Sequence, residues 1–308
     1  MIKKKKQQKK TSRPGNRRGY YIYGKNFFIL PNQLWKKVSE NDRVVFNLVG
    51  SEVNVSFDRE QLVPTVREPS DCAYEIHPKF SFYALSIPDR PISSLPADLR
   101  TYIDHSRKLL GDKEISAIGL YKGSQKRWYS HIWYVLKEPF GSIVIPEKFR
   151  PYQRGAAAHY IDMVHRKVAV PVTFYTRSVG SPSEDIAIVA WLNSTIGLAF
   201  RYKDRAWLGS ASERMSGEQL DAMEVLNVSK FSSSDLAKLA KHLSKLPSPL
   251  PDFEEQLKEP FYCESGRSDL DCFILELLGI KESKTYHYQA RCINIVKEWI
   301  HIIKSVNA

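Results

Sequence analysis

The chain has 308 residues, of which 43% are hydrophobic and 26% charged, and its formal net charge at pH 7 is +12. These proportions are near the averages of soluble globular proteins. No apolar run approaches the roughly 20 residues of a membrane span, and no apolar segment follows the basic N-terminus as in a secretory signal. We therefore expect a cytoplasmic protein of one large or two modest domains, with no membrane partner.

The cysteines do not suggest a metal site. Cys72, Cys263, Cys272 and Cys292 form no C-x-x-C pair, and no histidine lies at ligand spacing from a cysteine pair. The pattern therefore predicts reduced, mostly buried thiols and no bound metal.

The positive charge is concentrated at the N-terminus. Residues 1–25 contain ten Lys or Arg residues and no acid, which leaves 36 basic against 34 acidic residues in the rest of the chain. This composition predicts a disordered basic tail over residues 1–19. Such a tail either attracts phosphate backbones without reading sequence or only solubilises or localises the protein, and composition alone does not choose between these alternatives.

After the tail, the first half of the chain has the character of strands. β-Branched and aromatic residues cluster or alternate in residues 20–30, 42–57, 74–88 and 165–179, and two further short aliphatic and aromatic runs cover residues 128–136 and 141–149. Between them, apolar residues at helical spacing predict a helix over residues 93–110, with Ser94 as its cap.

The second half has the character of helices. Residues 183–202 predict a helix with Ser183 as N-cap, and residues 216–228 a short helix followed by a strand. Three more helices are expected around a proline-rich link at 247–266: residues 233–246, 268–280 and 286–306. The chain thus reads as a mixed α/β (α+β) body over residues 20–230 and a helical region over residues 231–308.

The common catalytic motifs are missing from the sequence. It contains no Gly-rich phosphate loop, no G-x-S-x-G elbow and no H-E-x-x-H pattern. Asp252, Glu282 and Lys284 have the residue types of a metal-dependent nuclease site, but they fall in the proline-rich link and in a loop between helices. Nuclease carboxylates need rigid strand ends, so we assign no catalytic residue, and the nuclease stays an alternative.

Two segments interleave basic and aromatic residues, as nucleic-acid-binding surfaces do: "KGSQKRWYSHIW" (122–133) and "RYKDRAWLGSASERM" (201–215). Arginine forms bidentate hydrogen bonds to guanine edges, and hydroxyls bond to phosphates or bases. The alternatives are a half-buried strand with Trp133 in the core, and a solvated helix end with a flexible loop. The predicted DNA contacts are Arg201, Lys203, Arg205, Ser210 and Arg214, with Lys126 and Arg127 as backbone contacts on a neighbouring loop.

The order of these segments resembles the C-terminal target-recognition region of adenine-N6 DNA methyltransferases of restriction–modification systems, which is similar to the recognition domains of type I specificity subunits. Leu192, Asn193 and Ser194 match the family's L-N-S signature at the end of a helix. Gly209 and Ser210 match its variable loop, and Leu220 with "VLNV" matches the short helix and strand that follow this loop in the family. "SIVIPEKFR" upstream and "RSDLDCFILELLG" downstream resemble the family's P-k and R-x-x-L-D passages, so the resemblance runs from about residue 70 to the C-terminus. Asn193 and Ser194 are also residues that cap or turn a helix end.

The resemblance implies sequence-specific binding of double-stranded DNA by a target-recognition-type domain. The family's catalytic N-P-P-[YF] motif and its glycine loop for S-adenosylmethionine are absent from this sequence. We therefore expect no cofactor in this chain, and S-adenosylmethionine in a methyltransferase catalytic subunit or domain that acts as its partner. The competing hypotheses are the metal-dependent nuclease and an assembly protein with a nucleic-acid-binding tail.

Overall fold

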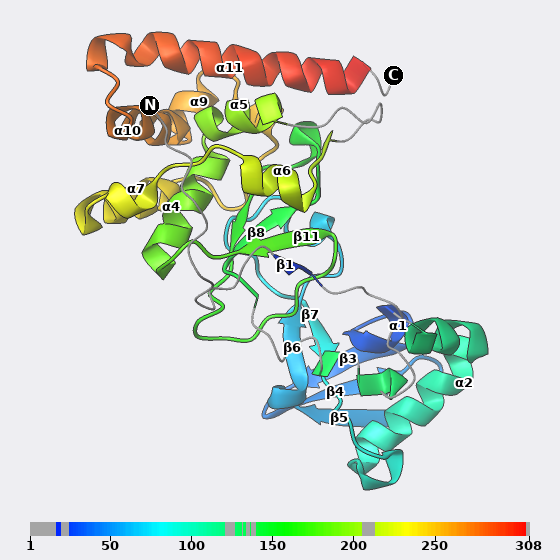
Figure 1. The fold of residues 1–308 in the computed structure, drawn as a ribbon. Coiled ribbons are helices and arrows are strands. Elements are labelled where there is room, and N and C mark those ends of the chain that lie inside the picture. The colour runs from blue at the N-terminus through cyan, green and yellow to red at the C-terminus, as the bar shows by residue number, and fades with distance from the viewer. Residues whose placement is uncertain are drawn as a thin grey trace.

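The computed structural model describes residues 17–19, 25–120, 127–130, 132–133, 136, 140–204 and 213–305 (Figure 1). Small antiparallel sheets occupy the first part of the chain and helices predominate from residue 182 onward. This arrangement confirms the mixed α/β (α+β) class. No helix in the described ranges is both long and apolar enough to cross a membrane. The four cysteines are free thiols, but only Cys72 is buried, so the expectation of mostly buried thiols is wrong.

The N-terminal lobe contains two antiparallel sheets with the strand orders β3–β4–β5 and β2–β7–β6. Their strands are β2 (Ile29–Leu30), β3 (Trp35–Glu40), β4 (Arg43–Leu48), β5 (Asn54–Asp58), β6 (Leu62–Thr65) and β7 (Phe82–Leu85). Strand β4 alternates strictly, with Val44, Phe46 and Leu48 buried, because successive side chains of a strand point to opposite faces. The hairpin expected within residues 42–57 is therefore confirmed, with Gly50 in its turn at φ 78°.

The strand expected over residues 20–30 is only partly present. Where the chain is described, helix α1 (Lys25–Phe28) precedes the two-residue strand β2. Phe27 and Phe28 are both fully buried, as are Ile29 and Leu30 of β2. The aromatic residues of this stretch thus belong to the core of the N-terminal lobe.

Helix α2 (Ala97–Leu120) covers the sheet of the N-terminal lobe beside β5 (Figure 1). It buries Leu99, Tyr102 and Ile103 at the predicted helical spacing. The indole N–H of Trp35 donates to the Ser106 hydroxyl at 3.0 Å, which ties β3 to this helix. The regular helix expected over residues 93–110 ends where Gly111 leaves helical geometry at φ 74°.

The C-terminal lobe is built on a sheet of order β1–β11–β8–β10 and a small ladder between β9 and β12. The strands are β1 (Arg17–Arg18), β8 (Ile143–Pro146), β9 (Lys148–Phe149), β10 (His159–Tyr160), β11 (Phe174–Arg177) and β12 (Glu213–Arg214). Arg17 and Arg18, expected within the basic tail, form β1 and pair with β11. Residues 1–16 of the expected tail lie outside the described residues. In the run 128–136, the described residues Trp128–Ser130 form a 3-10 turn.

The single helix expected over residues 183–202 is two helices, α4 (Pro182–Asn193) and α5 (Thr195–Asp204). The N-cap is Ser181, whose hydroxyl accepts from the Glu184 N–H at 3.3 Å while the Glu184 carboxylate accepts from the Ser181 N–H at 2.6 Å. This reciprocal box fixes the start of α4 two residues before the expected cap, and Pro182 occupies the first helical position.

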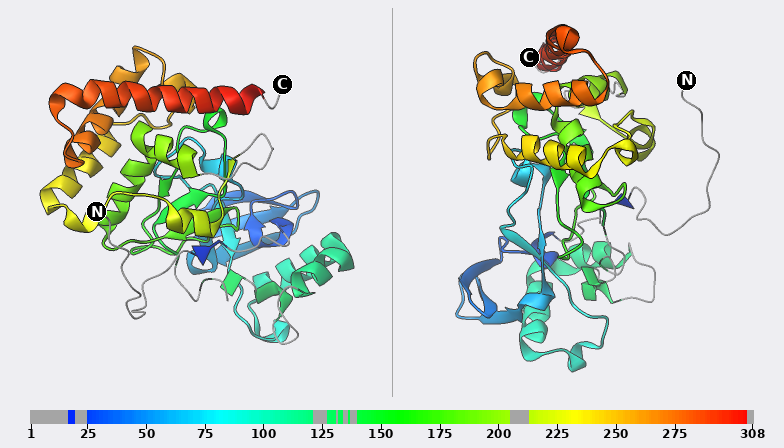
Figure 2. Two further views of the ribbon diagram at one scale, coloured as in Figure 1. Left: turned by 45° about the horizontal axis from the view of Figure 1, so that its top comes forward. Right: turned by 90° about the vertical axis from the view of Figure 1, so that its left-hand side faces the viewer.

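The remaining helices are α6 (Gly217–Ala222), α7 (Ser233–Ser244), α8 (Phe253–Gln256), α9 (Phe261–Glu264), α10 (Arg267–Leu277) and α11 (Glu282–Ser305). No strand follows α6 as expected, because the chain continues into the 3-10 turn Val228–Lys230. Helix α7 packs on α4, and α11 packs on α5 and α10 at the end of the molecule opposite α2 (Figures 1 and 2). One core cluster contains Leu192, Leu239 and Ile274, so the body and the C-terminal helices share a core across residue 230.

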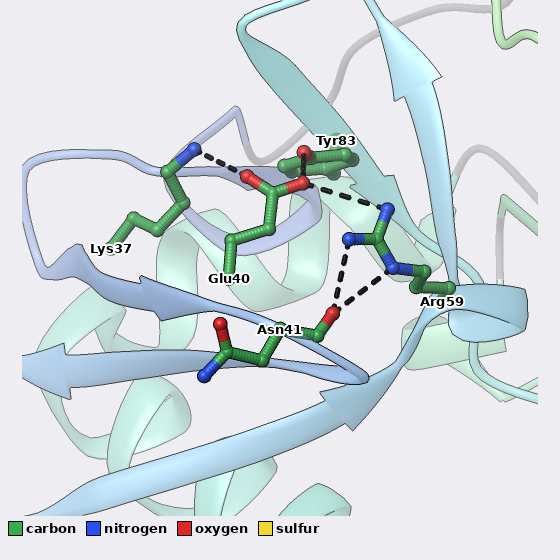
Figure 3. A network of polar contacts seen from close by, with 5 residues as sticks. All are labelled: Lys37, Glu40, Asn41, Arg59 and Tyr83. Atoms are coloured by element: carbon green, nitrogen blue, oxygen red, sulfur yellow. Dashed lines mark hydrogen bonds and ion pairs between the residues drawn. The ribbon is translucent and has the colours of Figure 1, made fainter.

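A polar network on the N-terminal lobe ties the β3–β4 hairpin to β7 (Figure 3). The Glu40 carboxylate accepts from the Lys37 ammonium at 2.7 Å and from the Tyr83 hydroxyl at 2.6 Å. Arg59 lies 3.8 Å from the same carboxylate and donates to the Asn41 carbonyl at 3.0 Å. The hydrogen bonds from Lys37 and Tyr83 lower the pKa of Glu40 below its ordinary value of 4.5, so the network favours the ionised carboxylate.

We predict that Glu40→Gln lowers the free energy of unfolding at pH 7 by less than about 1 kcal/mol, because the network is partly exposed. A depressed pKa in the folded state contributes stability that is present above the unfolded pKa and lost as the pH falls through the folded value. The difference between wild type and variant should therefore narrow below pH 4.5. Urea unfolding at a series of pH values measures it, with the exposed Glu52→Gln as control; a difference that stays constant with pH would contradict the prediction.

Candidate nucleic-acid interface

The break between α4 and α5 is made by Ser194, which has extended backbone geometry (φ −76°, ψ 157°). Its hydroxyl donates to the Trp191 carbonyl at 2.7 Å and accepts from the Gly197 N–H at 2.9 Å. One side chain thus serves the last turn of α4 and the first turn of α5. Gly197 is required beside it, because a Cβ there would lie 1.9 Å from the Trp191 carbonyl oxygen.

Asn193 joins the end of α4 to the segment before β10. Its side-chain oxygen accepts from the Ala157 N–H at 2.8 Å, and its amide donates to the carbonyls of Ala158 and Val189 at 2.8 and 2.9 Å. The side chain is fully buried. A buried amide with its oxygen and both of its hydrogens bonded fixes one arrangement of the two segments.

Arg267 links this corner to α8 and α10. The fully buried guanidinium donates to the Asn193 carbonyl and, through Nε at 2.9 Å, to the Gln256 side-chain oxygen. Gln256 in turn donates to the Gly155 carbonyl at 2.9 Å. The L-N-S and R-x-x-L-D passages therefore meet in one buried polar network, which consists of Asn193, Thr195, Gln256, Tyr262, Arg267 and Asp271.

Asp271 completes the buried polar network. Its carboxylate accepts from the Thr195 N–H at 2.9 Å, at the start of α5, and from the Tyr262 hydroxyl at 2.6 Å. Burial raises the pKa of Asp271, and the hydrogen bonds oppose that rise. The six residues of the buried polar network hydrogen-bond to one another and to the backbone of neighbouring segments. The network therefore holds these segments in fixed positions and forms the frame of the lobe.

Arg201, which the sequence predicts as a DNA contact, is buried inside this frame. The side chain is 1% exposed, lies with its guanidinium 4.5 Å from the centre of the Phe149 ring, and donates to the carbonyls of Ala157 and Pro146 at 3.1 and 3.4 Å. The prediction that Arg201 contacts DNA is therefore wrong. A guanidinium bonded to two buried carbonyls supports the fold and is not accessible to a base.

Lys203, the next predicted DNA contact, lies on the surface at the end of α5. It is exposed and forms an ion pair with Glu224 at 3.4 Å. An exposed pair of this kind contributes little to stability and exchanges readily for another partner. Lys203 is therefore available to an anionic ligand.

The rest of the predicted contact set lies partly outside the described residues. Arg205, Ser210 and Lys126 fall outside them. Arg214 is described as part of β12, whose register pairs it with Lys148, and the next N–H, of Met215, donates to the Glu147 carbonyl at 3.1 Å. Both flanks of residues 205–212 are thus attached to the stretch 146–149, by Arg201 on one side and by β12 on the other.

Arg127 lies in the other lobe. It forms an ion pair with Asp89 at 3.0 Å, and the neighbouring Tyr129 hydroxyl donates to the Arg90 carbonyl at 2.6 Å. Trp133, for which a core position was the alternative, is half-buried and lines a cavity with Phe140 and Met163. The described contacts of Arg127 therefore attach it to the N-terminal lobe, whereas residues 201–214 belong to the C-terminal lobe.

The residues of the nuclease alternative have helical roles. The Asp252 carboxylate caps α8 by accepting from the Glu255 N–H at 2.9 Å, and Glu282 lies in the first turn of α11. Among the residues that the structure describes, no group of three His, Cys, Asp or Glu side chains is arranged to hold a metal ion.

A concave basic surface beside β9, the basic pocket, was not predicted from the sequence. It has a volume of about 490 Å³ and is lined by Lys148, Arg150, Gln153, Arg154, Glu68 and Glu147, among others. The sequence signal was the stretch "EKFRPYQR", in which three basic residues follow a buried strand. Glu68 comes from a segment some 80 residues earlier, so the pocket itself was not visible in the sequence.

The comparisons with known proteins give a fold likeness. No protein-family model matches the chain, and no curated protein sequence matches it. A solved structure described as the type IIG restriction endonuclease BpuSI aligns with a TM-score of 0.55 at 12% identity, over 87% of this chain and 31% of that one. The chain therefore spans about a third of the length of that structure and shares its fold there.

We predict that Asn193→Ala lowers the free energy of unfolding by at least about 1–3 kcal/mol, because the Ala157 N–H and the Ala158 carbonyl lose their partner in a buried site. The exposed Asn227→Ala, on the C-terminal lobe, should change it by less than about 0.5 kcal/mol. Denaturant unfolding of both variants measures the effect. Equal, small losses would show that Asn193 does not hold the frame together.

Proposed function

We propose that this chain is the DNA target-recognition portion of an adenine-specific restriction–modification enzyme. In this proposal it binds double-stranded DNA, and a methyltransferase catalytic subunit or domain with S-adenosylmethionine modifies the adenine. The fold likeness to a restriction endonuclease supports the restriction–modification part of the proposal. The resemblance of the L-N-S and R-x-x-L-D passages to target-recognition regions supports the adenine-specific part.

The observation that carries the proposal is the attachment of residues 205–212 at both flanks. Arg201 binds the Pro146 carbonyl before the segment, and β12 pairs with β9 after it. Both attachment points, the Pro146 carbonyl and strand β9, lie on a scaffold held by buried hydrogen bonds. Arg205 and Ser210 lie between these points in the sequence. Binding residues are commonly placed on loops that a rigid scaffold positions, and arginine is the residue that most often reads guanine in the major groove.

The proposal assigns the chemistry of methyl transfer to the partner. This chain binds duplex DNA through its cations, reads a few base edges from the 203–214 segment, and presents the adenine to the catalytic site. A flipped base is required for chemistry on its amino group. The role of this chain is to hold the duplex in register while the partner takes up the adenine.

A binding selection from random duplex DNA tests the proposal. Residues 1–16 are removed to reduce the phosphate-driven background, and the cut stops there because Arg17 and Arg18 form β1. At about 150 mM salt we expect enrichment of a short, defined motif that contains adenine. Recovery of no motif from a folded sample would contradict target recognition by the isolated chain.

Within residues 203–214, the proposed recognition segment, we predict different effects for Arg205 and Lys203. Arg205→Ala should cost about 1–3 kcal/mol on the preferred duplex and relax one position of the motif, whereas Lys203→Ala should weaken all duplexes about equally. Competition binding on duplexes with single substitutions measures both, with the exposed Arg291→Ala on α11 as control. An Arg205→Ala variant with unchanged affinity and preference would rule out a base contact.

A further inference from the structure

The basic pocket lies beside β9, the strand that pairs with β12 directly after residues 205–212. Lys148 is the β9 residue whose register partner is Arg214, and the Glu147 carbonyl beside it binds the Met215 N–H. Arg150 and Arg154 flank the 3-10 turn Pro151–Gln153 that follows β9 directly. The stretch 146–149 that receives both flanks of residues 205–212 thus also leads into the basic pocket.

The basic residues of the pocket have no acidic partner among the described residues. Within the part of the chain that the structure describes, Lys148, Arg150 and Arg154 form no ion pair. By contrast, Arg43, Arg127 and Arg177 each pair with an aspartate within 3.4 Å. Unpaired cations gathered in a concave site favour an anionic ligand there.

Two contacts hold the cationic side chains in the pocket. Arg154 donates to the Pro69 carbonyl at 3.0 Å, and burial lowers its pKa to about 10, so it stays charged at neutral pH. Arg150 donates to the Gln153 side-chain oxygen at 3.3 Å. Each guanidinium has five N–H donors, so both keep donors free for a ligand.

The acidic residues at the pocket do not neutralise it. Glu68 and Glu147 line it, and each has an interaction of its own. Glu147 is buried, and its N–H donates to the Thr173 carbonyl at 2.8 Å. Three cations against two acids leave the pocket with a formal positive charge, and Lys148 is its most exposed cation.

We propose that the basic pocket binds backbone phosphates of duplex DNA next to the bases that residues 203–214 contact. This inference rests on the proposed function and adds Lys148, Arg150 and Arg154 as phosphate-binding residues. Contacts of this kind set the register of a protein on the duplex and carry no sequence information. A volume of about 490 Å³ accommodates a phosphate with its bound water.

The test is the salt dependence of duplex binding by the full chain. Lys148→Ala, Arg150→Ala and the double variant are compared with wild type by fluorescence anisotropy between about 50 and 200 mM salt. Each lost phosphate contact should reduce the slope of log K against log salt by about 0.9, and affinity should fall equally for the selected motif and for unrelated duplexes. Arg154 is left in place, because its bond to Pro69 also supports the fold.

The control is a variant that removes two exposed lysines elsewhere, Lys241→Ala on α7 with Lys297→Ala on α11. A double pocket variant whose slope equals that of the control would overturn the inference, and a retained motif preference would show that the proposed function stands without it. A reduced slope in a chain that prefers no motif would support the pocket and contradict target recognition. Saturable binding of inorganic phosphate, lost in the double variant with no change in the DNA slope, would assign the pocket to a free anion and overturn the inference.

Discussion

The fold of the C-terminal lobe depends on one buried guanidinium. Arg267 binds the carbonyl at the end of α4 and the side chain of Gln256, and the same network continues through Asp271 to the start of α5. Charged groups this deep are costly to bury unless their hydrogen bonds are made. The network is therefore stable only when the corner between α4 and α5, helix α10 and the segment 155–158 are all in place. That requirement gives the lobe one geometry.

This constraint determines how the surface is presented. Asn193 and Arg201 both bind the backbone at Ala157, so the position of α5 follows from the same set of buried bonds. The strand stretch 146–149 then carries the flanks of the recognition segment and leads into the basic pocket. Binding residues commonly lie between such fixed points of a rigid scaffold, and the proposed function places the DNA-reading residues there.

Other buried polar groups are structural. Cys72 lies 3.7 Å from the His159 ring, an arrangement that resembles a nucleophile with its base. Burial raises the pKa of Cys72 to about 12 and lowers that of His159 to about 4, so both groups are neutral at pH 7. A reactive cysteine needs its thiolate. The neutral pair contributes to packing.

The class of fold, the hairpin of β4 and β5, and the helices of the C-terminal part were predictable from the sequence, because local periodicity and turn residues specify such elements. The break between α4 and α5 was not predicted: the expected helix ran through residues 183–202, and ending a helix was only an alternative role for Asn193 and Ser194. The tertiary structure decided which cations face solvent. Arg201 and Lys203 are two residues apart and equally basic, yet one binds carbonyls 44 and 55 residues away and the other lies on the surface. Burial of a charge depends on partners that the fold brings from distant segments, and no local pattern encodes them.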